Sequence, residues 1–290
     1  MDLSPGSLLS HYLLERPIGS GGMGTVWAAR DERSGLPVAL KLLRASESDP
    51  ETARVRLMRE AEATQRITHP AVVPVSDVFD HLGSPVLVME LLHGETLRTL
   101  LLREQPLPLA RTAELLLPIC EALLEAHARG IAHRDLKPEN IFIEQPRAEP
   151  LTSGTRVRLL DFGVALSYEP PPGLEQTPIT ALGTLVGTLA YMAPEQALRP
   201  TEIDHRVDIW ALGVTLYEAL SGCRPIEGDT APDTMRQLLV GGITPLAVLR
   251  PDLPVDVLEL VGAMLTRQRE KRPADLARAV DTLRRQLTNG

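Results

Sequence analysis

The stretch that decides the fold is His133-Arg134-Asp135-Leu136-Lys137-Pro138-Glu139-Asn140, which holds a carboxylate, an ammonium and an amide in one short loop. A second acidic motif, Asp161-Phe162-Gly163, follows it along the chain. A glycine-dense segment and a lysine flanked by apolar residues precede both motifs. Together these groups supply a base, a cation and two metal ligands, which phosphoryl transfer requires. One such motif can arise by chance, but the ordered set predicts a phosphotransfer site.

The use of lysine supports this interpretation. Only three of the 30 Lys and Arg side chains are lysine, namely Lys41, Lys137 and Lys271. Arg is planar and forked, whereas Lys is a compact point charge on a flexible stem, so the two do not exchange freely where one ammonium must meet phosphate oxygens. The first two lysines fall inside the proposed motifs, and their retention by chance is the alternative explanation.

Composition restricts the class of protein. A chain of 290 residues with 43% hydrophobic residues can form one large domain or two lobes. The net charge of −8 argues against a nucleic-acid partner, because such a protein needs a basic face. The two cysteines lack metal-type spacing, no apolar run approaches the ~20 residues of a membrane span, and residues 1–10 lack a signal-peptide pattern. We therefore expect a cytoplasmic protein with no membrane segment in this chain, and tethering through regions beyond Gly290 stays open.

The two parts of the chain differ in the secondary structure that their sequences favour. The first ninety residues favour strands, with one helix at 50–66 and strands at 12–17, 25–29, 38–42, 72–79 and 86–90. After Gly94 the periodicity predicts short strands at 141–143 and 157–160 and helices at 111–129, 208–221, 234–240, 255–265 and 274–287. The predicted fold class is α+β.

Each residue of the two main motifs has a candidate role. Asp135 is the candidate base, because a carboxylate near a substrate hydroxyl can accept its proton late in transfer. Asn140 and Asp161 offer oxygens to Mg²⁺, and Lys137 lies close enough to the base to meet the charge on the moving group. A lone Asp is more often a cap or turn residue, so these roles depend on the ordered set.

The glycine-dense segment and Lys41 extend the site. Gly19-x-Gly21-x-x-Gly24 precedes Thr25-Val26-Trp27, which favours a strand rather than the helix that a dinucleotide fingerprint needs. A flap over phosphates is our interpretation, and a plain glycine-rich hairpin turn is the alternative. Lys41 would meet phosphates and one carboxylate, Glu60 or Glu62, unless it is an exposed strand lysine.

Five motifs of this chain occur in the same order as in a known family. The chain resembles the eukaryotic-like (Hanks-type) protein kinases, in their bacterial serine/threonine branch. The matching motifs are Gly19-Ser20-Gly21-Gly22-Met23-Gly24-Thr25-Val26-Trp27, Val38-Ala39-Leu40-Lys41, the 133–140 stretch, Asp161-Phe162-Gly163 and Ala193-Pro194-Glu195. The resemblance covers roughly residues 12–286. It implies a bilobal protein kinase fold that binds ATP and Mg²⁺ in a cleft, with Mn²⁺ as an alternative ion.

The resemblance also implies the domain plan. An N-lobe (12–90) would hold a small antiparallel β-sheet and one main helix, and a hinge (90–93) would lead to a larger, mainly helical C-lobe (94–286). A short N-terminal extension (1–11) and a tail (287–290) would flank this kinase domain.

Individual roles follow from the same resemblance. It selects Glu60 as the partner of Lys41, assigns Asp208 to bracing the catalytic loop, and pairs Glu195 with Arg272. Met89 resembles the gatekeeper residue, and the backbone from Glu90 to Leu92 would bind adenine. The expected ATP-binding residues are Ile18, Gly19, Gly21, Gly22, Gly24, Val26, Ala39, Lys41, Met89, Glu90, Leu92 and Phe142.

Substrate class and regulation are implied as well. Lys137-Pro138-Glu139 is similar to the serine/threonine type of catalytic loop, and Thr188 resembles the threonine that contacts its base and lysine. Proteins with Ser or Thr hydroxyls are therefore the expected substrates. Arg134 beside the base suggests that a phosphorylated activation loop docks there, with Thr177, Thr180 and Thr184 as candidate sites. Bacterial relatives also allow a homodimer that autophosphorylates in trans.

Two other functions compete with this interpretation. A pseudokinase scaffold commonly loses the strand lysine, the base or the metal aspartate, but Lys41, Asp135 and Asp161 are all present. A small-molecule phosphotransferase of the same fold would lack the Ala193-Pro194-Glu195 segment, which resembles a feature for docking extended polypeptide.

Overall fold

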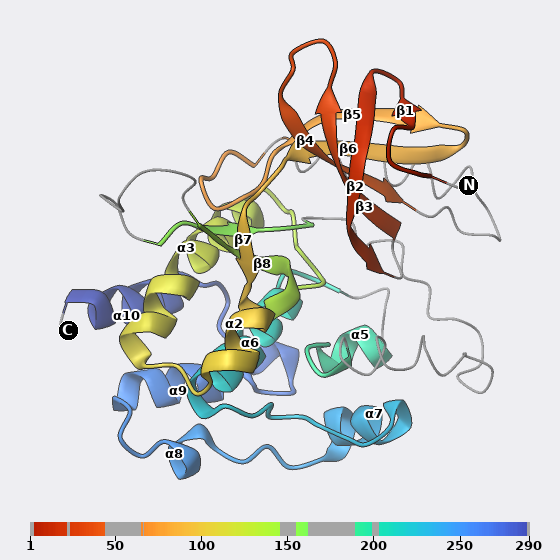
Figure 1. Ribbon diagram of the computed structural model, residues 1–290. Helices are drawn as coiled ribbons and strands as arrows, with labels where there is room; N and C mark the ends of the chain where they lie inside the picture. Colours follow the sequence, from red (N-terminus) through yellow and green to blue (C-terminus); the bar gives the residue numbers. More distant parts are fainter. Residues whose placement is uncertain are drawn as a thin grey trace. The chain divides into compact units, whose positions relative to one another are not determined.

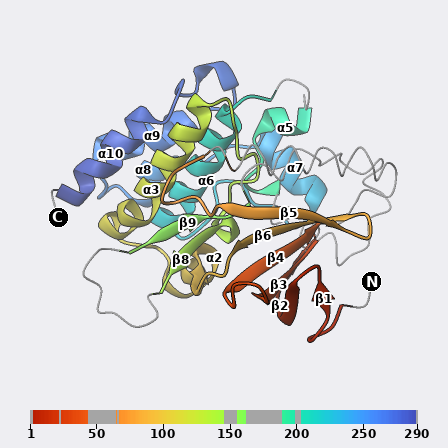
Figure 2. The ribbon, with the colours of Figure 1, turned by 90° about the horizontal axis from the view of Figure 1, so that it is seen from above.

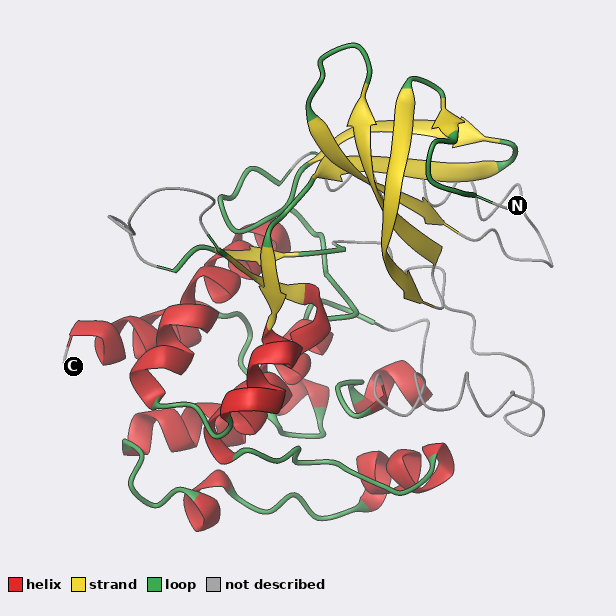
Figure 3. Cartoon of the chain, viewed as in Figure 1, coloured by secondary structure: helices red, strands yellow, loops and turns green. Residues whose placement is uncertain are grey.

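The computed structural model describes residues 3–21, 24–43, 65, 67–145, 155–161, 189–198 and 203–288. The described residues fall into two compact units (Figure 1). The strand-rich unit comprises those up to Thr68 and Val72–His93, and the helix-rich unit comprises His69–Ala71 and those from Gly94 on. Figure 3 shows that long strands dominate the first unit and helices the second, which confirms the predicted α+β class.

The strand-rich unit is built on one antiparallel sheet with the strand order β1-β2-β3-β4-β6-β5. Alternation places Trp27, Leu40 and Val88 on one face, where they form a buried core with Leu9 and neighbouring apolar residues. The strands are β1 (Leu8–Leu9), β2 (Tyr12–Gly21), β3 (Gly24–Asp31), β4 (Pro37–Leu43), β5 (Val75–His81) and β6 (Ser84–Glu90).

Two features of this sheet were not predicted from the sequence. Strand β2 runs through the glycine-dense segment to Gly21, because Gly19 and Ser20 continue the pairing with β3 beyond the predicted end at Pro17. Residues 8 and 9 join the sheet as β1. The side chain of Leu9 is only 1% exposed, so it packs this part of the N-terminal extension (1–11) against the core. The helix expected at 50–66 lies outside the described residues apart from Gln65.

The helix-rich unit contains a small sheet, two 3-10 turns and the described helices (Figure 1). The sheet has the order β7-β8-β9, with β7 at Gly94–Thr96, β8 at Ile141–Glu144 and β9 at Val157–Leu159. The helices are α2 (Leu97–Glu104), α3 (Leu109–Ala128), α5 (Pro194–Leu198), α6 (Arg206–Ser221), α7 (Ala231–Val240), α8 (Leu246–Leu249), α9 (Val255–Met264) and α10 (Ala277–Thr288). The 3-10 turns are η1 (Pro138–Asn140) and η5 (Arg269–Lys271).

Helix α6 is the centre of this unit. Every residue from Val207 to Leu220 is buried, as expected for a helix inside a core. Helices α3 and α9 pack against it, and α10 lies along α3 (Figure 2). Gly213 permits the contact with α9, because a Cβ there would lie 2.8 Å from the Cβ of Met264. Gly222 ends the helix in the left-handed conformation with φ +78°.

Several short elements were not predicted, namely α2, α5, α8 and β7. Each is too short to show a clear hydrophobic period. Among the helices in the described ranges, none combines the length and apolar character needed to cross a bilayer.

Candidate catalytic site

The loop between α3 and β8 brings Asp135, Lys137 and Asn140 together. Lys137 Nζ lies 2.9 Å from Oδ1 and 2.9 Å from Oδ2 of Asp135. Asn140 donates from Nδ2 to the carbonyl oxygen of Asp135 at 2.7 Å and to its Oδ2 at 3.1 Å. The side chains of Asp135 and Lys137 are only 12% and 15% exposed. Two donors therefore orient a carboxylate that is largely shielded from water.

Asp161 is positioned next to this loop through the backbone. The N–H of Leu160 donates to the carbonyl oxygen of Asn140 at 2.8 Å. Asp161 itself has φ +57°, which is uncommon for a residue other than glycine. The backbone hydrogen bond of Leu160 thus brings the residue before Asp161 against Asn140.

Asn140 and Asp161 fit a divalent cation that takes oxygen ligands. Because Nδ2 of Asn140 faces Asp135, its Oδ1 is the amide atom left for an ion. Within the described residues, no group of three or more His, Cys, Asp or Glu is arranged to hold a metal. Mg²⁺ usually takes one or two protein ligands and completes its shell with water and substrate phosphates. The two side chains therefore fit an ion that arrives with a nucleotide.

Asp208, at the start of α6, holds the beginning of the loop. Its Oδ2 accepts from the backbone N–H of His133 at 2.7 Å and from Nε2 of His127 at 2.8 Å, and its Oδ1 accepts from the N–H of Arg134 at 2.7 Å. Asp208 is fully buried, and burial alone would raise the pKa of its carboxyl group. The hydrogen bond from His127 and the neighbouring donors outweigh burial, so this pKa lies below its usual value.

The side chain of His133 connects the loop to Leu160, the residue directly before Asp161. It is completely buried, and its Nε2 lies 2.8 Å from the carbonyl oxygen of Leu160. Nδ1 lies 3.3 Å from the backbone nitrogen of Asp135. Both contacts are satisfied when Nε2 carries the proton and Nδ1 accepts. His133 therefore supports the proposed base and the proposed metal ligand together.

Arg134 has a left-handed backbone that is bonded at both ends. Its φ is +67°, and its N–H donates to Asp208 as described above. Its carbonyl oxygen accepts from Nε2 of Gln196 at 3.0 Å, while Oε1 of Gln196 accepts from the N–H of Ala193 at 2.9 Å. Gln196 on α5 thus ties the Ala193-Pro194-Glu195 segment to the loop.

The structure brings Glu195 and Arg272 together in a bidentate ion pair, with nitrogen–oxygen distances of 2.6 and 2.7 Å. The remaining N–H groups of Arg272 donate to the carbonyl oxygens of Arg206, Thr266 and Arg267. Its guanidinium also lies over the ring of Trp210, 4.9 Å from the ring centre. All five donors are satisfied, so the buried charge is fully compensated.

The strand-rich unit groups several of the expected nucleotide-binding side chains. Pairing places Val26 opposite Lys41 and Ala39 opposite Met89. Because Ala39 and Lys41 are two residues apart on β4, all four side chains share one face of the sheet. That face is opposite to the one carrying Leu40. Lys41 is only 4% exposed.

The other expected nucleotide residues are distributed as follows. Ile18 is 40% exposed and lies at an irregularity of β2, between the paired residues Pro17 and Gly19. Glu90 ends β6, and Leu92 follows it. In the helix-rich unit, Phe142 points away from the side of β8 on which Ile141 and Ile143 are buried. Six expected residues lie outside the described part of the chain: Gly22, Glu60, Thr177, Thr180, Thr184 and Thr188.

Sequence reasoning missed two residues that contact the loop, Gln196 on α5 and Arg98 on α2. Arg98 donates to Glu139 at 3.0 Å. Neither residue stands in a motif, and both contacts span long stretches of chain. No local pattern could have indicated them.

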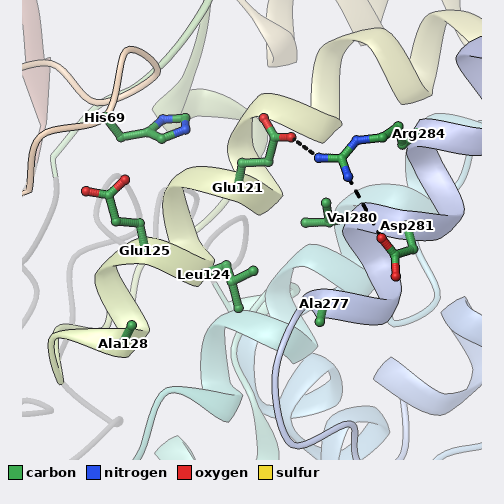
Figure 4. A pocket seen from close by; sticks show the side chains of 9 residues that line it. All are labelled: His69, Glu121, Leu124, Glu125, Ala128, Ala277, Val280, Asp281 and Arg284. Carbon is green, nitrogen blue, oxygen red and sulfur yellow. Dashed lines mark hydrogen bonds and ion pairs between the residues drawn. The ribbon is translucent and has the colours of Figure 1, made fainter.

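A groove of about 540 Å³ in the helix-rich unit lies between α3 and α10 (Figure 4). Arg284 of α10 pairs with Glu121 of α3 across it at 2.7 Å, and it also lies 3.9 Å from Asp281 of its own helix. No residue of the loop 133–140 lines this groove. The lining residues are His69, Glu121, Leu124, Glu125, Ala128, Ala277, Val280, Asp281 and Arg284.

Known proteins match this chain along nearly its whole length. The protein kinase domain family matches residues 12–283. Serine/threonine-protein kinase pkn3 of Myxococcus xanthus is 36% identical over 280 residues, which are 95% of this chain and 49% of the relative. Serine/threonine-protein kinase PknD of Mycobacterium tuberculosis is 37% identical over 270 residues, 93% of this chain and 38% of the relative.

A solved structure has the same fold. The crystal structure of the PknI kinase domain of Mycobacterium tuberculosis superposes with a TM-score of 0.73, at 24% sequence identity, and covers 99% of this chain and 100% of that chain. The chain thus covers all of that solved chain, but only half or less of the length of pkn3 and PknD.

Proposed function

This chain belongs to the protein kinase family, and on that premise we propose that it is a serine/threonine protein kinase, which transfers the γ-phosphate of ATP to Ser or Thr hydroxyls of proteins. The observation that carries the proposal is the orientation of the Asp135 carboxylate by Lys137 and Asn140. The names of pkn3 and PknD support the choice of Ser and Thr as acceptors.

The loop residues would divide the chemistry between them. Asp135 accepts the proton of the acceptor hydroxyl as its oxygen bonds to the γ-phosphorus and the bond to the leaving ADP oxygen breaks. Lys137 stabilises the charge on the group in transit. Asn140 and Asp161 would hold Mg²⁺, or Mn²⁺ as an alternative, and the ion neutralises phosphate charge when it is bound.

The strand-rich unit would bind the nucleotide. Lys41, paired with Glu60, would orient the phosphates beneath the glycine-rich segment that contains Gly19, Gly21, Gly22 and Gly24. The apolar side chains on the same sheet face as Lys41, together with Ile18 and Phe142, would pack on adenine, and the backbone from Glu90 to Leu92 would bind its edge. The shared face of Val26, Ala39 and Met89 supports this assignment.

Domain plan and regulation belong to the same proposal. The kinase domain would span residues 12–286, with the hinge at 90–93. Phosphorylation of Thr177, Thr180 or Thr184 would order the activation loop near Arg134, Thr188 would contact the base and lysine of the loop, and a homodimer would allow the reaction in trans. We propose a cytoplasmic location for this domain.

The test is transfer of labelled γ-phosphate from ATP and Mg²⁺ to a generic basic protein, compared with the Asp135→Asn variant. We expect transfer by the wild type and a loss of several orders of magnitude in the variant. Equal signals from both proteins, or ATP binding without transfer by the wild type, would refute the proposal, and the second result would indicate a pseudokinase.

Two further measurements examine individual roles. Lys41→Met should abolish most of the rate while ATP binding changes little, because the ammonium orients phosphates. An equal loss of binding and rate would contradict that role. Intact-mass measurement after incubation with ATP should show added phosphate, and its absence would contradict autophosphorylation.

A further inference from the structure

Helix α2 places Arg98 in a partly buried polar cluster at the end of the catalytic loop, residues 133–140. Its Nε donates to Oε1 of Glu139 at 3.0 Å, and its Nη1 and Nη2 donate to Oε1 and Oε2 of Glu218 at 2.9 and 3.2 Å. The hydroxyl of Tyr191 accepts from Nη2 of Arg98 and donates to Oε2 of Glu218. The side chains of Arg98 and Glu218 are only 13% and 4% exposed, whereas that of Glu139 is 43% exposed.

The cluster attaches the loop to α6 a second time. Asp208, in the first turn of α6, accepts from the backbone of His133 and Arg134 at the start of the loop. Glu218, in the last turn of the same helix, holds Arg98, which holds Glu139 at the end of the loop. One rigid helix thus fixes both ends of the stretch that contains Asp135.

Arg98 is the connection on which this second attachment depends. Among the described residues, Oε2 of Glu139 is buried and accepts no hydrogen bond. Arg98 is therefore the residue that holds this carboxylate, through Oε1. Burial alone would lower the pKa of Arg98, but Glu218, Tyr191 and Glu139 outweigh it and raise that pKa. Without Arg98, Glu218 would keep the hydroxyl of Tyr191 and a long 3.4 Å contact with Arg224.

We propose that Arg98 is a positioning residue for phosphoryl transfer, which fixes the Glu139 end of the catalytic loop against Glu218 of α6 and thereby sets the position of Asn140 relative to Asp135. The inference rests on the proposed function, since it assigns those two residues to the reaction. Geometric errors of about 1 Å in a reacting group can cost about a hundredfold in rate, so a loose loop end should reduce kcat.

The first test compares Arg98→Met with the matched control Arg103→Met. Arg103 lies on the same helix and pairs with Glu95 and Glu104, but its side chain is 52% exposed and it does not contact the loop. We expect Arg98→Met to lower kcat at least about tenfold with the KM for ATP within about twofold, and Arg103→Met to behave as wild type. Arg98→Lys should be intermediate, because an ammonium lacks the fork that reaches both carboxylates. Wild-type kcat in Arg98→Met would overturn the proposal.

A second variant separates positioning from mere stability. Arg98→Met/Tyr191→Phe/Glu218→Met removes the buried polar groups together, and apolar replacement of a buried ion pair is often neutral or stabilising. We expect its melting temperature to return towards that of the wild type, while kcat stays low because Glu139 has no anchor. Recovery of wild-type kcat would show that Arg98 contributes stability alone and would refute the positioning role.

The last measurement does not depend on activity. Hydrogen exchange of the segment 133–144 should be faster in Arg98→Met than in the wild type and unchanged in Arg103→Met. If the wild type transfers no phosphate, the proposed function fails. The hydrogen-exchange rates of residues 133–144 would still decide whether Arg98 fixes the loop. Unchanged exchange in Arg98→Met would refute the proposal.

Discussion

Asn140 donates from its Nδ2 to both the carbonyl oxygen and the carboxylate of Asp135, at 2.7 and 3.1 Å. The amide that we propose as a metal ligand therefore also orients the proposed base. Changing Asn140→Asp would remove this donor and place a second carboxylate against the first. We expect kcat to fall by about two orders of magnitude in steady-state assays, as when a catalytic hydrogen-bond donor is lost. A kcat within about threefold of wild type would contradict the double role.

Asp208 should make stability depend on pH in the acid range. Its pKa is depressed in the folded protein from the ordinary value of 3.8, so its stabilising effect is complete above pH 3.8 and is lost as the pH falls through the lower folded value. Asp208→Asn should reduce the free energy of unfolding by about 3 kcal/mol at pH 7, because it disrupts a buried network. Urea unfolding from pH 7 to below pH 3.8 should show the difference from wild type shrinking only at the acid end. A difference that stays constant down to the lowest pH would exclude this linkage.

The ion pair of Arg272 and Glu195 should be worth far more than an exposed pair. Arg272→Met leaves Glu195, which is 10% exposed, without its partner, and breaking a buried pair costs about 3–5 kcal/mol. The control is Arg278→Met, since Arg278 and Glu259 are 51% and 63% exposed and such a pair contributes about 0–1 kcal/mol. Urea unfolding measures both losses. Similar losses in the two variants would refute the distinction.

Two helical glycines should respond oppositely to alanine. A Cβ at Gly213 would lie 2.8 Å from the Cβ of Met264, so Gly213→Ala should push α6 and α9 apart and cost about 1–3 kcal/mol. At Gly262, within α9, a Cβ would meet no atom within 4 Å, so Gly262→Ala should stabilise by about 0.5–1 kcal/mol through helix propensity. Thermal unfolding gives the sign of each change, and the same sign for both would contradict the packing argument.

The sequence predicted those features of the site that depend on neighbouring residues. Asp135, Lys137 and Asn140 lie within one loop, so their proximity follows from the length of the chain between them. The strand alternation around Lys41 likewise predicts which side chains share a face of β4. The same reasoning did not find α2 or α5, because both helices are shorter than the window of about 11–18 residues over which a hydrophobic period is read.

The sequence by itself determined the family, the α+β class and the loop in which the reacting groups stand, because these depend on residue types at short spacing. Only the tertiary structure decided how the loop with these proposed catalytic residues is held. Asp208, Gln196 and Arg98 reach it from α6, α5 and α2, and each of these residues lies far from the loop along the chain. Such contacts are set by the packing of α2, α5 and α6, and packing depends on the shape and burial of side chains that no local pattern records.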